Sequence, residues 1–171
     1  MQSGSTKNAE ATSDQFHILA ETIPQLAWMA GPDGRDEYFN QRWYDYTQST
    51  AEQSLGENWF KFVHPDDQQR AQETWDTAVQ SGQAYESEFR LYNGKTGEYQ
   101  WFLDRGLPLT DAQGRVLKWF GTYTNIDEQK HTEEALRQSR EEFRLLIEAM
   151  PQIVWIDQPD GQLEYANQRW Y

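Results

Sequence analysis

Three polar residues near the middle of the chain, His64, Asp66 and Asp67, carry the side chains of a metal site or an acid–base pair. Imidazole and carboxylate groups bind zinc and transfer protons. Pro65 lies among them, however, and proline favours the first position of a helix, where acidic residues stabilise the positive end of the dipole. The cluster therefore predicts a helix start, and we assign it no catalytic residue and no metal ligand.

Other catalytic arrangements find no support in the sequence. His131 lies in a charged run, but the proline that follows a kinase phosphoacceptor histidine is absent, so we interpret it as an exposed helix residue. No glycine-rich phosphate loop and no nucleophile with a base and an orienting group is present. The chain has no cysteine, which excludes disulfides, thiolate nucleophiles and any chromophore attached through sulfur. We expect a protein that is not an enzyme.

Large aromatic residues are the remaining candidates for a binding site, because they make up 15% of the chain. They either line a ligand cavity or fill a core, and a filled core is the commoner case since protein interiors leave few voids. The candidate cavity residues are Trp28, Phe39, Trp43, Phe62, Trp75, Phe89, Trp101 and Phe120.

Composition narrows the partners. The net charge of −13 disfavours nucleic acid and anionic membrane surfaces, which bind basic proteins. No apolar run reaches the roughly 20 residues of a membrane helix, and the first residues do not resemble a signal peptide. We therefore expect a cytoplasmic protein without a membrane segment in this part of the chain.

An internal repeat divides the chain. Residues Phe16–Tyr44 align without gaps to Phe143–Tyr171, so each residue of the first segment matches the residue 127 positions later. Solenoid repeats are about 20 to 50 residues long, so this period predicts tandem domains, the second represented by its first residues.

Turn and capping residues predict the first elements. Residues 1–13 are small and polar and are predicted to be a disordered tail. A helix over Ser13–Glu21 is followed by a hairpin of Gln25–Ala30 and Asp36–Phe39 around a Pro-Asp-Gly turn. Asn40 is placed to cap the next helical turn.

The remaining elements are a helix, three strands and a second helix. Pro65 to Gly82 predicts a helix with a buried stripe at Ala71, Trp75, Ala78 and Val79. The strands are predicted at Tyr85–Tyr92, Glu98–Leu109 and Val116–Ile126, with a pair between Glu88 and Arg105 on neighbouring strands.

A charged helix is expected to follow the last strand. From Glu128 to about Met150 the pattern is helical, with Asp127 as its N-cap. Leu136, Phe143, Leu146 and Met150 have a and d spacing, which fits a short coiled coil between two copies or an amphipathic helix packed on its own domain. We divide the chain into a tail (1–13), a domain (14–127), a connecting signalling helix (128–149) and a truncated second domain (150–171).

An ordered set of motifs covers, together with the Asn40 region, nearly all of 16–130. The motifs are Trp59–Asp67, Tyr85–Leu91, Trp101–Gly106, Trp119–Thr122 and Ile126–Lys130. In this order they resemble the PAS family with its PAC-type C-terminal segment. One departure is that such domains usually end the last strand with Asp-Ile-Thr, where this chain has Asn125, Ile126 and Asp127. The resemblance implies that these three residues couple the sheet to the connecting helix.

The resemblance also implies a fold and a function. The fold is α+β: a five-stranded antiparallel sheet with helices on one face around a small cavity, followed by a C-terminal connecting helix. The function is a sensory input module that relays a ligand or cofactor signal to an output domain of the same polypeptide, such as a histidine kinase or a diguanylate cyclase. The alternative is a module that dimerises through its terminal helices and binds no ligand.

The nature of any cofactor stays open. Haem is disfavoured because the helix over Asp66–Gln80 carries no histidine, and noncovalent flavin has no supporting motif. A cavity too small for anything beyond water would argue against a bound ligand.

Overall fold

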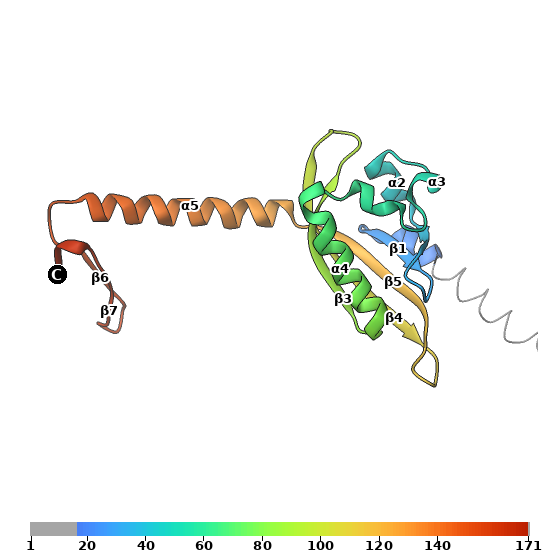
Figure 1. Ribbon diagram of the computed structural model, residues 1–171. Coiled ribbons are helices and arrows are strands. Elements are labelled where there is room, and N and C mark those ends of the chain that lie inside the picture. Colours follow the sequence, from blue (N-terminus) through green and yellow to red (C-terminus); the bar gives the residue numbers. More distant parts are fainter. Residues whose placement is uncertain (1–16, 171) are drawn as a thin grey trace, which may run out of the picture. The chain divides into compact units, whose positions relative to one another are not determined.

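The computed structural model describes residues 17–170 (Figure 1). The chain divides after Asp127 into two compact units. The predicted tail of residues 1–13 and the start of the helix predicted from Ser13 lie outside the described residues. Within 17–170, no helix has both the length and the apolar character needed to cross a membrane.

The first unit is built on one antiparallel sheet, as predicted. Its strands are β1 (Leu26–Ala30), β2 (Asp36–Phe39), β3 (Tyr85–Tyr92), β4 (Tyr99–Thr110) and β5 (Val116–Asn125). The strand order is β2-β1-β5-β4-β3, so the two strands of the first hairpin pair with the last strand of the unit. Every predicted strand is found, with ends that differ by no more than one residue.

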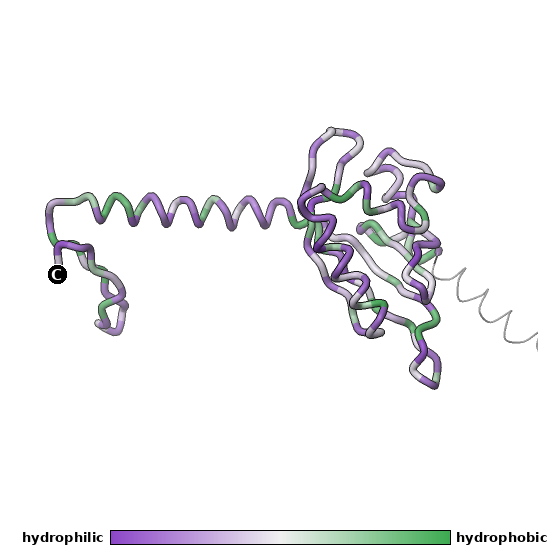
Figure 2. The backbone as a smooth tube through the Cα atoms, viewed as in Figure 1, coloured by the Kyte–Doolittle hydropathy of each residue, from purple (hydrophilic) through white to green (hydrophobic). Residues whose placement is uncertain are grey.

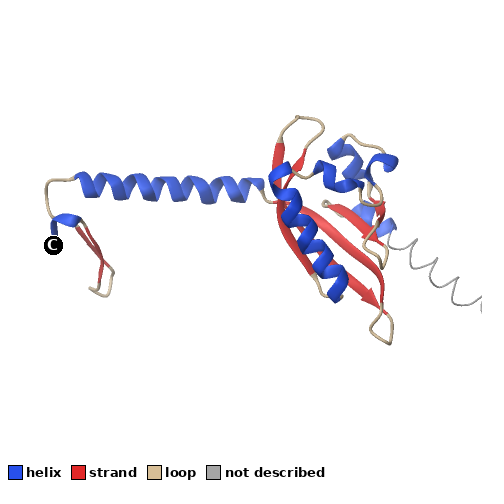
Figure 3. Ribbon diagram, viewed as in Figure 1, coloured by secondary structure: helices blue, strands red, loops and turns tan. Residues whose placement is uncertain are grey.

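The helices of this unit contribute to a core on one face of the sheet, and α4 lies over this face (Figure 3). They are a helix over residues 17–22, α2 (Gln41–Thr47), α3 (Ala51–Ser54), the 3₁₀ helix η1 (Asn58–Phe62) and α4 (Pro65–Ser81).

The ends of α4 confirm the helix predicted from Pro65 to Gly82. The His64 imidazole accepts a hydrogen bond from the backbone N–H of Asp66 (3.2 Å), and Pro65 occupies the first turn. Gly82 ends the helix in a left-handed conformation with φ 65°, which glycine adopts without a steric cost.

The second unit contains the connecting helix and a short hairpin. Helix α5 (Asp127–Ala149) leads to β6 (Trp155–Asp157), β7 (Leu163–Ala166) and the 3₁₀ helix η2 (Gln168–Trp170). Most of α5 is hydrophilic, and its hydrophobic residues gather toward its C-terminal end (Figure 2). Of its residues, only Ile147 is buried.

The two units share one hydrogen-bonding pattern, anchored by a fully buried asparagine in each. The Asn40 side chain accepts from the N–H of Ala27 (3.0 Å) and donates to the carbonyls of Ala20 and Gln25 (2.9 and 3.0 Å). In the second unit, 127 residues later, Asn167 accepts from Val154 (3.1 Å) and donates to Ile147 and Gln152 (3.1 and 2.9 Å).

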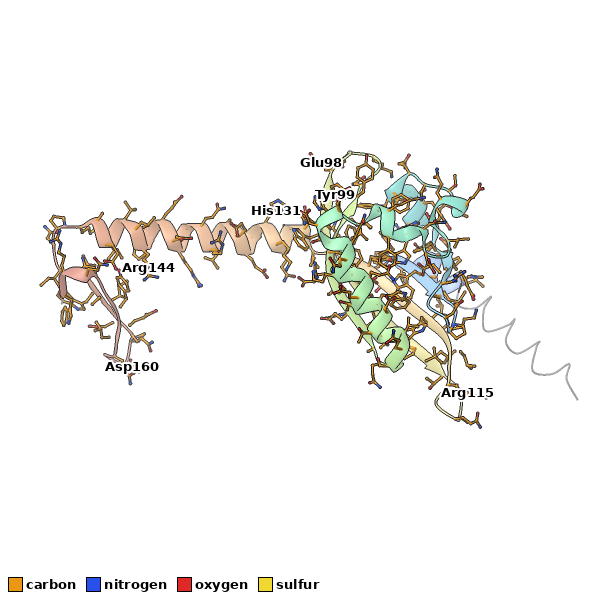
Figure 4. All side chains as sticks on the ribbon, in the orientation of Figure 1. Glu98, Tyr99, Arg115, His131, Arg144 and Asp160 are labelled. Atoms are coloured by element: carbon orange, nitrogen blue, oxygen red, sulfur yellow. The ribbon has the colours of Figure 1, made fainter. Side chains whose placement is uncertain are left out.

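The hairpin turns repeat as well. Gly34 and Gly161 have φ values of 82° and 81°, and each donates to the carbonyl three residues earlier. Asp33 and Asp160 each accept from the backbone two residues later, Asp160 being labelled at the hairpin tip in Figure 4. The hairpin of the second unit therefore has the same turn and the same asparagine hydrogen bonds as the hairpin of the first.

Candidate functional site

Six of the eight predicted cavity residues come together in the core of the first unit. Phe39 stacks on Trp43 with ring centroids 4.3 Å apart, and Phe62 meets Trp43 edge-on at 5.6 Å. Trp28 and Trp75 form a perpendicular pair at 5.3 Å. Phe89, the sixth, is fully buried in the same cluster.

The other two, Trp101 and Phe120, are corrections, because they lie on the opposite face of the sheet. On β4 the residues that point into the core are Phe102 and Asp104, so Trp101 points away and lies under the Arg90 guanidinium, 5.4 Å from the ring centroid. On β5 the inward residue is Trp119, and Phe120 lines a surface pocket instead. Successive side chains of a strand alternate between faces, so only one of two adjacent aromatics can be in the core.

Two glycines in the sequence indicate which face of β4 and β5 is in the core. Gly106 and Gly121 pair across β4 and β5, and the Trp28 indole covers both. A Cβ on Gly121 would lie 2.2 Å from a Trp28 ring atom, and one on Gly106 would lie 2.7 Å away. Glycine within a strand often marks such a close approach. Gly106 lies two residues after the inward Asp104 on β4, and Gly121 lies two residues after the inward Trp119 on β5, so both glycines are on the core face of the sheet.

Two acidic residues that the sequence reasoning missed are buried among the aromatics. Asp104 is 1% exposed and accepts a hydrogen bond from the Trp28 indole N–H at 2.8 Å. Asp36, 6% exposed, lines the same space as Asp104. The sequence could have revealed these acids only as acidic residues at core-facing strand positions, which requires knowing which side of the strand faces the core.

Two hydroxyl groups of β3 are buried beside Asp104. Ser87 is the cross-strand neighbour of Asp104, and the Tyr85 hydroxyl points to the same carboxyl. The Tyr85 hydroxyl interacts with both Asp104 and Ser87, although within the described residues neither hydroxyl makes a hydrogen bond of ordinary geometry. The buried indole N–H of Trp119 on β5 also lacks such a bond to any described residue.

Burial dominates the electrostatics of this acid pair. Burial raises the pKa of Asp36 well above its ordinary value, and the neighbouring Asp104 raises it further. Burial likewise raises the pKa of Asp104 well above its ordinary value, although the Trp28 indole N–H and the Tyr85 hydroxyl both act in the opposite direction. Both carboxyls are therefore biased toward the neutral form.

The space around the pair is filled. It is lined by Trp28, Asp36, Trp59, Trp75, Asp104 and Tyr123, which leave no volume for a water-sized sphere. The aromatic residues immediately around the acid pair are therefore closely packed. Trp59 and Trp75 also line a neighbouring surface pocket of about 120 Å³, so they separate the acid pair from this opening.

The acidic residues at the start of α4 have a structural role. Asp67 accepts from the backbone N–H and the side chain of Arg90 on β3, the latter at 2.8 Å. Burial acts to raise the pKa of Asp67, but the bonds from Arg90 outweigh it and lower that pKa. The pair thus joins α4 to the sheet.

The predicted ion pair between Glu88 and Arg105 was wrong, because the partner of Arg105 is Glu86, two residues earlier. Arg105 bonds to Glu86 at 2.7 Å, because the register of β3 and β4 places these two opposite each other and places Glu88 opposite Leu103. Another surface pair, between Arg115 and Asp111 (2.7 Å), closes the turn between β4 and β5, where Figure 4 labels Arg115. Exposed pairs of this kind contribute about 0–1 kcal/mol.

The predicted coupling residues connect the sheet directly to α5. The N–H of Ile126 donates to the Trp101 carbonyl (2.9 Å), and the Asp127 carboxylate accepts from the Trp101 N–H (3.0 Å). Asn125 accepts from the Asp127 N–H at 2.9 Å. The first residue of the helix is thereby hydrogen-bonded to β4 with no intervening linker.

Comparison with known protein families gives two matches. The family described as PAS fold matches residues 36–123, about half of the chain. A second family, described as PAS domain, matches residues 141–171, which contain the repeat in the second unit.

The matching curated proteins are much longer than this chain. An uncharacterized protein, y4lL, of Sinorhizobium fredii is 30% identical over 161 residues, 94% of this chain and 19% of that protein. The peroxide stress-activated histidine kinase mak1 of Schizosaccharomyces pombe is 30% identical over 160 residues, covering 90% of this chain and 10% of the kinase. The two-component sensor PprA of Pseudomonas aeruginosa is 28% identical over 120 residues, covering 70% of this chain and 12% of the sensor.

Solved structures share the fold at low sequence identity. A sensory box histidine kinase/response regulator from Burkholderia thailandensis has a TM-score of 0.57 and 23% identity, covering 76% of this chain and 98% of that one. An RNA-binding light-oxygen-voltage receptor has a TM-score of 0.64 and 19% identity, covering 75% and 37%. At these identities the likeness concerns the fold alone.

Proposed function

This chain belongs to the PAS family, and on that premise we propose that it is the sensory input module of a larger signalling protein. The module receives a change in its core and passes it through α5 to an output domain of the same polypeptide. The relatives support this reading, since they include a histidine kinase and a two-component sensor of which the chain matches 10% and 12%.

The observation that carries the proposal is the joint at Ile126 and Asp127. Both residues are hydrogen-bonded to Trp101, so a displacement of β4 moves the first turn of α5 with it. A hydrogen-bonded joint without a flexible linker can transmit a small shift that a linker would absorb.

An insertion tests this relay. Gly-Gly placed after Asp127 in the full-length protein should leave the PAS domain folded and remove the regulation of the output. The matched control is Gly-Gly after Gly114, in the exposed turn between β4 and β5, which should leave regulation unchanged. Normal regulation with the insertion after Asp127 would refute the proposal.

A second candidate function, dimerisation without a ligand, is favoured by the exposed apolar residues of α5. Leu136, Phe143 and Leu146 are all more than half exposed, at the spacing of a coiled-coil seam. Leu136→Glu should weaken self-association in sedimentation, whereas Gln138→Glu, two residues along the helix, should not. A strict monomer at high concentration, with α5 helical by circular dichroism, would count against this function.

A further inference from the structure

The PAS core contains two acidic side chains in a space with no room for a ligand. Asp36 and Asp104 are nearly inaccessible to solvent, and the aromatic walls around them leave no volume for even a water-sized sphere. A proton needs no such volume. We propose that Asp36 and Asp104 form a proton-binding switch and that protonation of this pair is the signal the module reads. This inference rests on the sensory role proposed above.

The groups facing the pair supply hydrogen bonds but no positive charge. The Trp28 indole N–H comes from β1, the Tyr85 and Ser87 hydroxyls from β3, Tyr123 from β5, and Trp75 and Trp59 from α4 and η1. Tyr44 on α2 faces Asp36, whose charge raises the pKa of the Tyr44 phenol in addition to the effect of burial. Among the described residues lining this space, none is Lys, Arg or His.

This environment favours the protonated pair. An isolated charge in an apolar core is unfavourable without a paired cation, and two neighbouring carboxylates resist ionising together. The two groups therefore titrate as a coupled pair. The Tyr85 and Ser87 hydroxyls beside Asp104 provide the hydrogen-bonding capacity that a change in its protonation would use.

The effect on stability has a definite sign. Because both pKa values are raised in the folded state, the pair favours folding fully below the unfolded value of about 3.9. That contribution is lost as the pH rises through the folded pKa values. Asp67, whose pKa is lowered, acts in the opposite direction as the pH falls, and it is retained in the variants used below.

The pair also has a short route to the helix. Asp104 lies on β4 three residues after Trp101, which is hydrogen-bonded to Ile126 and Asp127. Ionisation of Asp104 therefore perturbs the strand that holds the joint with α5.

The test is a titration of the whole chain with ¹³C-labelled aspartate, read by NMR, together with tryptophan fluorescence. We expect the Asp36 and Asp104 carboxyl carbons to titrate well above the ordinary aspartate value of about 3.9, and the fluorescence to change over the same pH range. Asp104→Asn keeps the oxygen that accepts from Trp28 and should remove that fluorescence change. Glu73→Gln, on the exposed side of α4, should retain it.

Two results would overturn the switch. One is titration of both carboxyls near the ordinary aspartate value, and the other is a fluorescence change that persists in Asp104→Asn. If Asp104→Asn does not fold, the wild-type titration and Asp36→Asn decide between the same outcomes. The relay is judged separately by the insertion after Asp127, so a pair that titrates as expected supports the switch even where that insertion leaves regulation intact.

Discussion

Replacing Trp28 and Trp101 separately by alanine tests which side of each strand faces the core, because the two losses in unfolding free energy can be compared. The Trp28 side chain is 2% exposed, and truncating a buried tryptophan to alanine costs about 3–5 kcal/mol. The change also removes the indole N–H that lies 2.8 Å from Asp104, and leaving a buried acceptor without its donor costs about 1–3 kcal/mol. These effects overlap at one site, so we expect a loss of about 5 kcal/mol for Trp28→Ala.

Trp101→Ala should have a much smaller effect. Trp101 is only partly buried, on the opposite face of the sheet. Its contact with the Arg90 guanidinium is at 5.4 Å, and such a cation–π contact contributes about 0.5–1 kcal/mol near the surface. With some lost packing, the total should be about 1–2 kcal/mol.

The assay is urea unfolding followed by circular dichroism, because fluorescence would be altered by the substitutions themselves. Domains of this size are stable by about 5–15 kcal/mol, so Trp28→Ala can approach complete unfolding. Trp28→Phe keeps an aromatic ring and loses the N–H, and it serves where the alanine variant does not fold. Equal losses for Trp28 and Trp101, or a larger loss for Trp101, would refute the assigned facing.

Three further expectations follow from the same structure. In urea unfolding, Gly121→Ala should destabilise the domain by about 1–3 kcal/mol, because the new Cβ would lie 2.2 Å from the Trp28 ring and 2.5 Å from the Arg105 carbonyl oxygen. The control, Thr124→Ala at an exposed position of the same strand, should be nearly neutral. Asn40→Ala should cost about 2–4 kcal/mol by thermal unfolding, since it leaves the Ala27 N–H and two carbonyls unsatisfied, and a loss below about 1 kcal/mol would contradict that account. In hydrogen exchange, residues 152–156 should exchange faster than residues 116–124, because isolated two-stranded hairpins are marginally stable and Ile153 and Trp155 are half exposed; equal protection in a monomer would disprove it.

Residues that form turns, cap helices or end them allowed most of the fold to be predicted. The Pro-Asp-Gly turn, the cap at Asn40 and the helix bounded by Pro65 and Gly82 act through backbone geometry within a few residues, so the sequence expresses them locally. The strand pattern also identified five strands to within one residue at each end. The start of α5 followed from the end of the last strand.

The facing of the strands and the buried acids could not be predicted in the same way. Trp101 and Phe102, like Trp119 and Phe120, are adjacent aromatics, and hydrophobicity alone does not say which enters the core. A one-residue change of register exchanges the two faces, so the choice depends on contacts with β1 and α4 that are remote in sequence. Asp104 was missed for the same reason, since an acid is read as exposed until its strand has been oriented.

The packing of Trp28 on Gly106 and Gly121 has an evolutionary consequence. Neither glycine can gain a methyl group while the indole stays in place, and a smaller side chain at position 28 would leave a void above both. Substitutions at these three positions are therefore expected to be epistatic. Among relatives, a small residue at position 28 should accompany alanine or serine at the glycine positions, and a tryptophan should accompany two glycines.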